Sequence, residues 1–437
     1  DQYNDWINQR DDGFYDYISL GDKKDKHSVS IFENYSQGLC TSRDAWVYNY
    51  SKAKLTQNIS NMIDFYNSEL ERYKNSDAIN NQPKKLSDAE KYIASFMDSD
   101  DRKIAWSRDY RYTICRNKNK LFSGSRKQFS VYRPFTKTWC YFDKQICLDV
   151  YQLPKIFPEN GIENLMIGTA SIGAKSFSVL ISNVLQDLHT LESACQCFPM
   201  YLYEPKLEST NGFDFSDDSD VITAPSGKQY TRHEAITDDG LKHFTDFYND
   251  TSITKEALFY YIYGLLHSEE YKTKYANNLT KSLPHIPKVK TIADFRSFEE
   301  AGRKLADLHL NYESKEMYPV TFTKDISNLT DKDYYVNKIK FASKTDKSKI
   351  IYNSKITLEN IPLEAYEYVV NGKSAIEWVM ECQEVSRHKD SGIVNDANDW
   401  AIETMNNPRY PLELLQRVIT VSIDTVSIVN NLPKLDI

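Results

Sequence analysis

The chain has 437 residues, of which 41% are hydrophobic and 27% are charged, and its formal net charge is −8. At roughly 100–200 residues per domain, this length predicts two to four domains with substantial cores. Its 14 glycines and 14 prolines exclude a collagen-like or a Pro/Gly-rich disordered chain, and no apolar run approaches the ~20 residues of a membrane-spanning helix. We therefore expect no membrane partner.

The first residue and the cysteines indicate whether the chain is part of a longer polypeptide and in which cellular compartment it occurs. The sequence begins at Asp1 without a signal peptide, which indicates a piece of a longer polypeptide. The seven cysteines are odd in number and scattered, so a disulfide framework is not expected in a chain of this length. We expect a cytoplasmic location, where thiols stay reduced, and a monomer.

Hydrophobic spacing predicts helices near the N-terminus. Apolar residues recur at three- and four-residue steps from Ile59 to Tyr73, as on one face of a helix. Residues 75–85 are polar and are interpreted as a linker. Ser87 and Glu90 then form a capping-box pattern, which predicts that a short helix begins there.

Short apolar runs separated by turns follow, and they are typical of strands. They predict strands at residues 129–132, 165–167 and 177–181. Residues 207–220 carry five acidic residues and no Lys or Arg. This stretch is interpreted as a surface loop or a disordered excursion.

The next block is predicted to be helical. Leu258, Ile262 and Leu265 share one helical face, so we expect this helix to pack that face against a β-containing unit. Ser268 is a predicted cap for the helix that follows. Residues 297–300 form another capping-box pattern, which predicts a helix that begins there.

The C-terminal part combines strands and helices. Residues 334–358 are interpreted as β-rich, and residues 374–385 as a helix with Ser374 and Glu377 in capping positions. The last helix is predicted to start at Pro411, because proline suits the first helical position.

These elements predict a mixed α+β fold with several lobes. The expected parts are a helical connector at 1–85, a basic, β-containing first lobe at 86–225, a helical block at 226–330, and a β-rich block ending in helices at 331–437.

Motifs for catalysis are near misses. Residues 168–176 resemble a phosphate-binding P-loop, but Ala174 adds one residue before Lys175 and displaces the lysine from the phosphate cradle. A glycine-bearing connection between strands is the better interpretation. His233 begins a zinc-protease pattern, but Thr237 stands where its second histidine belongs. We therefore assign no catalytic residue, no metal ligand and no cofactor to this chain.

A basic segment stands out at residues 101–137. It holds eleven basic residues and two acidic ones, Asp101 and Asp109, so its local net charge is +9 although the whole protein is acidic. A local basic surface with interleaved aromatic residues favours phosphate binding, although a solvated charged loop has the same composition. The basic residues are Arg102, Lys103, Arg108, Arg111, Arg116, Lys118, Lys120, Arg126, Lys127, Arg133 and Lys137.

Several ordered strings resemble the C-terminal region of Type ISP restriction–modification enzymes, and the resemblance covers nearly the whole chain. These enzymes join nuclease, translocase, adenine methyltransferase and target-recognition parts in one chain. Residues 43–46 lie in an opening region that resembles the segment just after the methyltransferase core. The other strings are residues 131–135, 197–203, 263–271, 283–287, 305–313, 370–374, 391–396 and 398–400.

The resemblance implies a target-recognition region that reads double-stranded DNA for the methyltransferase and nuclease. It places S-adenosylmethionine, ATP and Mg²⁺ in upstream parts, and it implies contact with the methyltransferase domain. The basic segment would contact phosphates. Additional candidates for DNA contact are Tyr132, Lys175, Lys373, Arg387 and Lys389.

Other interpretations stay open. Residues 132–135 can instead fix a turn and fill a core, with Arg133 paired to a carboxylate. The whole chain can instead be an interaction module that docks the methyltransferase core to the motor and nuclease parts. A free-standing hydrolase with an unrecognised motif is the third alternative.

Overall fold

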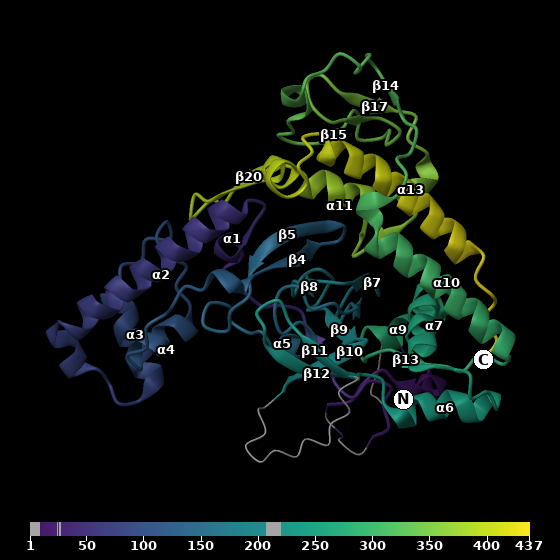
Figure 1. Ribbon diagram of the computed structural model, residues 1–437, viewed down its shortest axis with the longest axis horizontal. Coiled ribbons are helices and arrows are strands. Elements are labelled where there is room, and N and C mark those ends of the chain that lie inside the picture. Colours follow the sequence, from purple (N-terminus) through teal and green to yellow (C-terminus); the bar gives the residue numbers. More distant parts are fainter. Residues whose placement is uncertain (1–8, 24, 26–27, 207–219) are drawn as a thin grey trace.

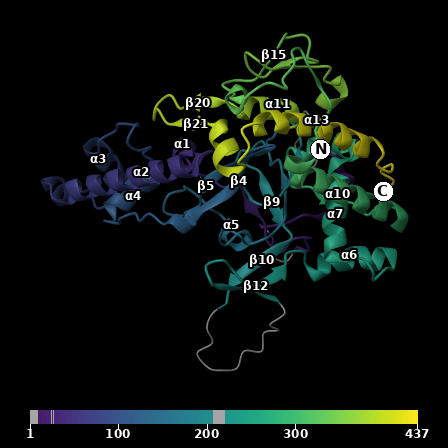
Figure 2. The same ribbon diagram turned by 45° about the horizontal axis from the view of Figure 1, so that its top comes forward.

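The computed structural model describes residues 9–23, 25, 28–206 and 220–437 and has a mixed α+β fold (Figures 1 and 2). This confirms the predicted fold class. A helical arm extends to the left of Figure 1 from a central group of sheets, and further helices cover the right side. The predicted acidic stretch at 207–220 lies outside the described residues except for Asp220.

Three helices form the arm: α2 (Lys52–Lys74), α3 (Leu86–Phe96) and α4 (Arg108–Cys115). The long helix predicted from hydrophobic spacing is confirmed as α2. It begins after Ser51, whose hydroxyl accepts a hydrogen bond from the Lys54 N–H at 3.1 Å. Tyr66 of α2 and Tyr110 of α4 are buried with ring centroids 5.6 Å apart, so aromatic packing joins the helices.

Two predicted helix starts are wrong. Helix α3 begins at Leu86, so Ser87 lies inside its first turn rather than before it. Residues 297–300 lie inside α10 (Ile292–Leu310), where the Ser297 hydroxyl donates to the Ala293 carbonyl at 2.9 Å. That helix is capped by Thr291, whose hydroxyl accepts from the Asp294 N–H. A capping-box pattern inside a continuing helix has no free N–H groups to cap.

Two four-stranded sheets form the centre. The hairpin β4–β5 places Phe129 opposite Trp139 and carries an irregularity between Val131 and Arg133. The strands predicted at 129–132 and 165–167 are confirmed, whereas the strand predicted at 177–181 begins only at Val179. In spatial order the sheets are β3 (Tyr48–Asn49), β5 (Thr136–Tyr141), β4 (Lys127–Arg133) and β8 (Leu185–Gln186), and β2 (Ser36–Gln37), β9 (Gln196–Pro199), β6 (Met166–Thr169) and β7 (Val179–Ser182).

The stretch that resembles a P-loop connects two of these strands. β6 ends at Thr169 and β7 begins at Val179, and Gly173 between them has a φ of 89°. No helix follows Lys175, because the chain enters β7 instead. The interpretation as a glycine-bearing strand connection is therefore confirmed.

The helical block lies on the right of Figure 1. Helix α7 is confirmed, and Ser268 caps α8 by accepting the Tyr271 N–H at 3.3 Å. The expectation of one packed face is wrong: α7 is buried on nearly all sides, between α10 and β7. The block comprises α6 (Asp238–Tyr248), α7 (Lys255–His267), α8 (Glu269–Lys274), α9 (Ala276–Leu279) and α10.

The C-terminal part confirms the predicted β-rich stretch. Its four-stranded sheet has the order β14 (Thr321–Phe322), β17 (Thr357–Glu359), β16 (Ile350–Ile351) and β15 (Lys340–Phe341). Helix α11 (Ala375–Cys382) has the predicted capping box of Ser374 and Glu377. The chain then forms the hairpin of β20 (Val385–Arg387) and β21 (Val394–Asp396). Helix α13 (Tyr410–Asn430) begins one residue before Pro411, which was its predicted start.

Shorter elements complete the fold. A three-stranded sheet has the order β10 (Tyr201–Pro205), β12 (Gln229–Glu234) and β11 (Val221–Thr223). The others are η1 (Asp12–Asp16), β1 (Ile18–Ser19), α1 (Asp44–Val47), η2 (Asp77–Asn81), η3 (Gly124–Arg126), α5 (Leu153–Ile156), β13 (His285–Ile286), η5 (Tyr312–Ser314), η6 (Asp331–Tyr334), η7 (Leu363–Tyr366), β18 (Val369–Val370), β19 (Lys373–Ser374), α12 (Ala397–Asp399) and η8 (Trp400–Thr404).

Most buried apolar side chains belong to one connected cluster. It runs from Phe14 to Val421, and a small second cluster contains Ile162, Tyr203 and Tyr230. The division into four parts stays a prediction. No helix within the described ranges has the length and apolar character needed to cross a membrane.

Candidate nucleic-acid interface

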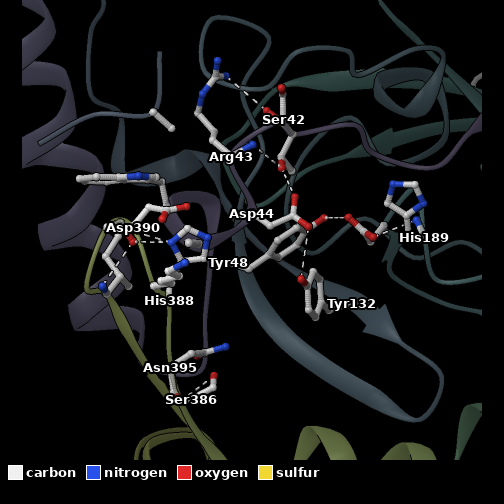
Figure 3. A pocket seen from close by; sticks show the side chains of 18 of the residues that line it. Ser42, Arg43, Asp44, Tyr48, Tyr132, His189, Ser386, His388, Asp390 and Asn395 are labelled. Atoms are coloured by element: carbon white, nitrogen blue, oxygen red, sulfur yellow. Dashed lines mark hydrogen bonds between the residues drawn. The ribbon is translucent and has the colours of Figure 1, made fainter. Parts of the chain in front are cut away.

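A cavity of about 850 Å³ lies where the arm meets the central sheets. Its walls come from residues 39–48, residues 187–189 and the hairpin β20–β21, and Asp101 from the arm and Tyr132 of β4 complete it. In Figure 3, Asp44 lies between Tyr132 and the hairpin residue His388. Residues far apart in the sequence therefore share one site.

This cavity joins three of the strings that carry the family resemblance. Residues 43–46, Tyr132 from residues 131–135, and Ser391, Ile393 and Asn395 from residues 391–396 all contribute to its lining. Of the additional candidates for DNA contact, Tyr132, Arg387 and Lys389 line it together. Local sequence patterns did not predict this meeting.

Asp187 anchors a hydrogen-bond network in the cavity wall. Its carboxylate accepts from Arg133 Nη1 at 2.8 Å and from the Tyr48 hydroxyl at 3.0 Å. Next to it, the Tyr132 hydroxyl donates to the Asp44 carboxylate at 3.2 Å. The interpretation in which Arg133 pairs with a carboxylate is therefore confirmed. Burial, followed by the neighbouring charge of Asp44, raises the pKa of Asp187 to about 6.

This raised pKa predicts a pH-dependent stability. Because the folded-state pKa of about 6 exceeds the ordinary value of 3.8, protonation of Asp187 favours the folded state. Its contribution is fully present below about pH 4 and is lost as the pH rises through about 6. The free energy of unfolding of wild type relative to Asp187→Asn should fall by about 3 kcal/mol across that window. Denaturant titrations at several pH values measure this, and a constant difference would contradict it.

The hairpin β20–β21 is fixed at its base. Asn395 Oδ1 accepts the Tyr50 N–H at 2.8 Å, and Asn49 Nδ2 donates to the Val394 carbonyl at 3.1 Å. Because Asn49 ends β3, these bonds tie the hairpin to the central sheet.

The tip of the hairpin is closed by its own side chains. His388 Nδ1 accepts the Ser391 N–H at 3.2 Å, and the Gly392 N–H donates to the His388 carbonyl at 2.9 Å. Arg387 and Lys389 are exposed here, and neither forms an ion pair with any carboxylate that the structure describes. The tip thus presents two uncompensated cations at the cavity mouth.

The basic segment does not form one surface. It runs from the arm through α4 into β4 and β5, and six of its eleven cations are paired with carboxylates. These pairs are Arg102–Asp100, Lys103–Asp98, Arg111–Glu90, Arg126–Asp143, Arg133–Asp187 and Lys137–Glu313. Much of the local charge of +9 is therefore compensated in the fold.

Lys120 and Lys127 are also engaged. Lys120 is 3% exposed, and its Nζ donates to the Gln145 carbonyl and lies 3.8 Å from the Tyr110 ring centroid. Burial, with the nearby Arg43 charge, lowers the pKa of Lys120 to about 8. Lys127 Nζ donates to the Thr56 hydroxyl at 2.7 Å. Lys120 is thus turned inward, away from any phosphate at the surface.

Three cations of the segment remain uncompensated within the described ranges. Arg108 and Arg116 lie at the two ends of α4, and Lys118 follows in the next loop. All three are exposed and form no ion pair with a described carboxylate. Their role in phosphate contact stays a prediction.

Two further candidates lie elsewhere. Lys175 lines a different cavity of about 800 Å³ together with residues of α8 and α13. Lys373 pairs with Glu381 and lies 4.7 Å from the Trp378 ring centroid. Neither lines the cavity at the base of the arm.

Several residues of this site were not among the sequence candidates. Asp44, Asp187, His388 and Asn395 line the cavity, but none belongs to a catalytic, metal-binding or basic motif in the sequence. The family resemblance was a signal for Asp44 and Asn395, because residues 43–46 and 391–396 belong to its strings, but Asp187 and His388 lie in no string.

Comparison with known proteins agrees with the family resemblance found in the sequence. A family model described as the Type ISP C-terminal specificity domain matches residues 30–414. A solved structure of a nuclease-deletion mutant of the Type ISP restriction–modification enzyme LlaGI, in complex with a DNA substrate mimic, is 35% identical with a TM-score of 0.81. The match covers 100% of this chain and 36% of that chain. A search of curated proteins found no match.

Two more solved structures are similar to this chain over its whole length. The ATP-dependent Type ISP enzyme LlaBIII bound to DNA is 35% identical with a TM-score of 0.82, over 100% of this chain and 25% of that chain. A DrdV–DNA complex is 28% identical with a TM-score of 0.77, over 100% of this chain and 40% of that one. The chain thus spans well under half of each of these proteins. It belongs to the family of Type ISP C-terminal specificity domains.

Proposed function

We propose that this chain recognises a double-stranded DNA site on behalf of a Type ISP restriction–modification enzyme. The observation that carries the proposal is the cavity at the base of the arm, where three family strings meet beside uncompensated cations. The similar solved structures of LlaGI, LlaBIII and DrdV are DNA complexes, which supports the same substrate for this chain.

In this proposal, cations contact phosphates and fix the position of the protein along the duplex. Side chains of the cavity contact the bases. Arg108, Arg116 and Lys118 on the arm and Arg387 and Lys389 on the hairpin contact phosphates, because no described carboxylate competes for them. The hydrogen-bonding side chains between these two groups are in position to approach base edges.

The remaining functions of the enzyme would belong to other parts of it. We assign methylation, cleavage and translocation, with S-adenosylmethionine, ATP and Mg²⁺, to segments outside these 437 residues, and we expect contact with the methyltransferase domain. We expect a cytoplasmic location, where thiols stay reduced. We expect this chain to act as a monomer.

Salt titration of duplex binding tests the proposal. If five cations contact phosphates, the log–log slope of affinity against salt should be about −4 to −5, because each contact contributes about −0.9. The measurement is fluorescence anisotropy of labelled duplexes with the purified chain at several salt concentrations. Salt-dependent binding supports the proposal. Absence of duplex binding, with tight association to a purified Type ISP methyltransferase part, would favour the interaction module instead.

A further inference from the structure

The loop that follows α4, residues 116–123, presents two large apolar side chains to solvent. Leu121 is 71% exposed, the highest value among the exposed large hydrophobic residues of the described chain, and Phe122 is 38% exposed. Neither belongs to the hydrophobic core. These two adjacent side chains form a small exposed apolar patch, which is a candidate contact surface for a partner.

The backbone of this loop is held in place on one side by α2. Asn67 forms two hydrogen bonds with the backbone of Lys120: its Nδ2 donates to the Lys120 carbonyl at 2.9 Å, and its Oδ1 accepts the Lys120 N–H at 3.0 Å. The Tyr66 hydroxyl donates to the Lys118 carbonyl at 3.0 Å. The loop therefore has a defined shape before any partner binds.

On its other side the loop is tied to β5. The Ser123 N–H donates to the Tyr141 hydroxyl at 2.8 Å, and the Phe122 ring stacks on Tyr141 with centroids 5.7 Å apart. Between these anchors, the Lys120 side chain turns inward and is buried. Leu121 is thus the more exposed of the two large apolar side chains on a fixed loop.

The surroundings of the loop are basic. No Asp or Glu occurs in the sequence between Asp109 and Asp143. Arg116 and Lys118 are exposed next to Leu121, and Lys127 Nζ lies 5.8 Å from the Phe122 ring centroid. Apolar side chains flanked by cations are the combination with which proteins enter the base stack of a duplex while holding its phosphates.

We infer that Leu121 is a wedge that inserts between base pairs of the bound duplex, with Phe122 beside it and Arg116 and Lys118 on the flanking phosphates. The inference rests on the proposed DNA-binding function and adds to it a deformation of the duplex. Insertion partly unstacks one base step, and the exposed leucine leaves water when it enters the stack. A partner protein at this loop is the other possible occupant, and the experiment separates the two.

The test uses the full chain and a duplex that carries the fluorescent base 2-aminopurine at intervals along one strand. Binding of wild type should raise the 2-aminopurine fluorescence, because unstacking relieves its quenching. Leu121→Ala should abolish most of that rise and weaken binding by about tenfold or more, from lost apolar burial. Its salt slope should stay unchanged, since no charge is removed. Leu121→Met should restore the fluorescence rise.

Leu363→Ala is the matched control, because Leu363 is 64% exposed on η7 in the C-terminal part. It should behave as wild type. Leu121→Ala should unfold as wild type does, since the side chain is exposed. If wild type binds the duplex with a steep salt slope but Leu121→Ala gives the same affinity and fluorescence, the wedge is refuted while the DNA-binding function stands. If wild type binds no duplex, the wedge and the proposed DNA-binding function are both refuted. If Leu121→Ala weakens only association with a methyltransferase part, the loop is a protein contact and the wedge is also refuted.

Discussion

Replacement of Arg108, Arg116 and Lys118 together by alanine is expected to weaken binding to every duplex on the order of a hundredfold near physiological salt. These residues are the exposed, uncompensated cations of the basic segment among the described residues. Their loss should flatten the log–log salt dependence by about 2.7 units, or about 0.9 for each contact. The ratio between cognate and non-cognate affinities should change little, because phosphate contacts carry no sequence information. Anisotropy titrations on a target site and its single-base variants measure both quantities.

A control with the same change in charge is available at the other end of the molecule. Lys242 of α6, Lys274 of α8 and Lys304 of α10 are exposed. Helices α6 and α10 lie on the side opposite the arm (Figure 1). Their joint replacement by alanine should leave the affinity and the salt slope nearly unchanged. An equal loss in both variants would mean that net charge, rather than the arm, determines binding. A loss confined to one base position would instead identify a base-reading residue, worth about 1–3 kcal/mol.

Gly302→Ala is expected to destabilise the fold by roughly 3–5 kcal/mol. A Cβ at Gly302 would lie 1.9 Å from the Tyr260 carbonyl oxygen and 2.9 Å from the Gly264 nitrogen. Both are backbone atoms of α7, so relief requires the two buried helices to separate. Elsewhere in a helix the same change stabilises by about 1 kcal/mol, so the sign of the effect identifies the close approach. Denaturant unfolding followed by circular dichroism measures it.

Gly124→Ala is the control for this substitution. A Cβ there meets nothing within 4 Å, so the free energy of unfolding should stay within about 0.5 kcal/mol of wild type. If Gly302→Ala unfolds at the same denaturant concentration as wild type, helices α7 and α10 do not cross at the Gly264–Gly302 pair.

Elements with a strong local signal were predictable from the sequence. Helix α2 appears where apolar spacing placed it, because burial of one face requires that spacing. Helices α7 and α13 also appear where they were predicted, although α7 is buried on nearly all sides. The capping box of Ser374 and Glu377 is confirmed, whereas Ser87 and Ser297 lie inside helices. The same residue pattern occurs at the start of one helix and inside two others. The start of a helix depends on where the preceding chain turns, which this pattern does not determine.

The compensation of charge in the basic segment was not predictable in full, because several of its cations pair with residues outside the segment. Arg111 pairs with Glu90, Arg133 with Asp187 and Lys137 with Glu313. The last two partners lie 54 and 176 residues away in the sequence. A count of charges along the chain cannot include such pairs.

The sequence by itself determined the fold class, the main helices and the family, because local periodicity and ordered sequence strings can be recognised without knowing any tertiary contact. Only the tertiary structure decided which cations are uncompensated, that Lys120 faces inward, and that residues 43–46, 131–135 and 391–396 share one cavity. These properties depend on contacts between stretches up to hundreds of residues apart. Such contacts are set by the packing of the arm, the central sheets and the hairpin, which no local pattern records.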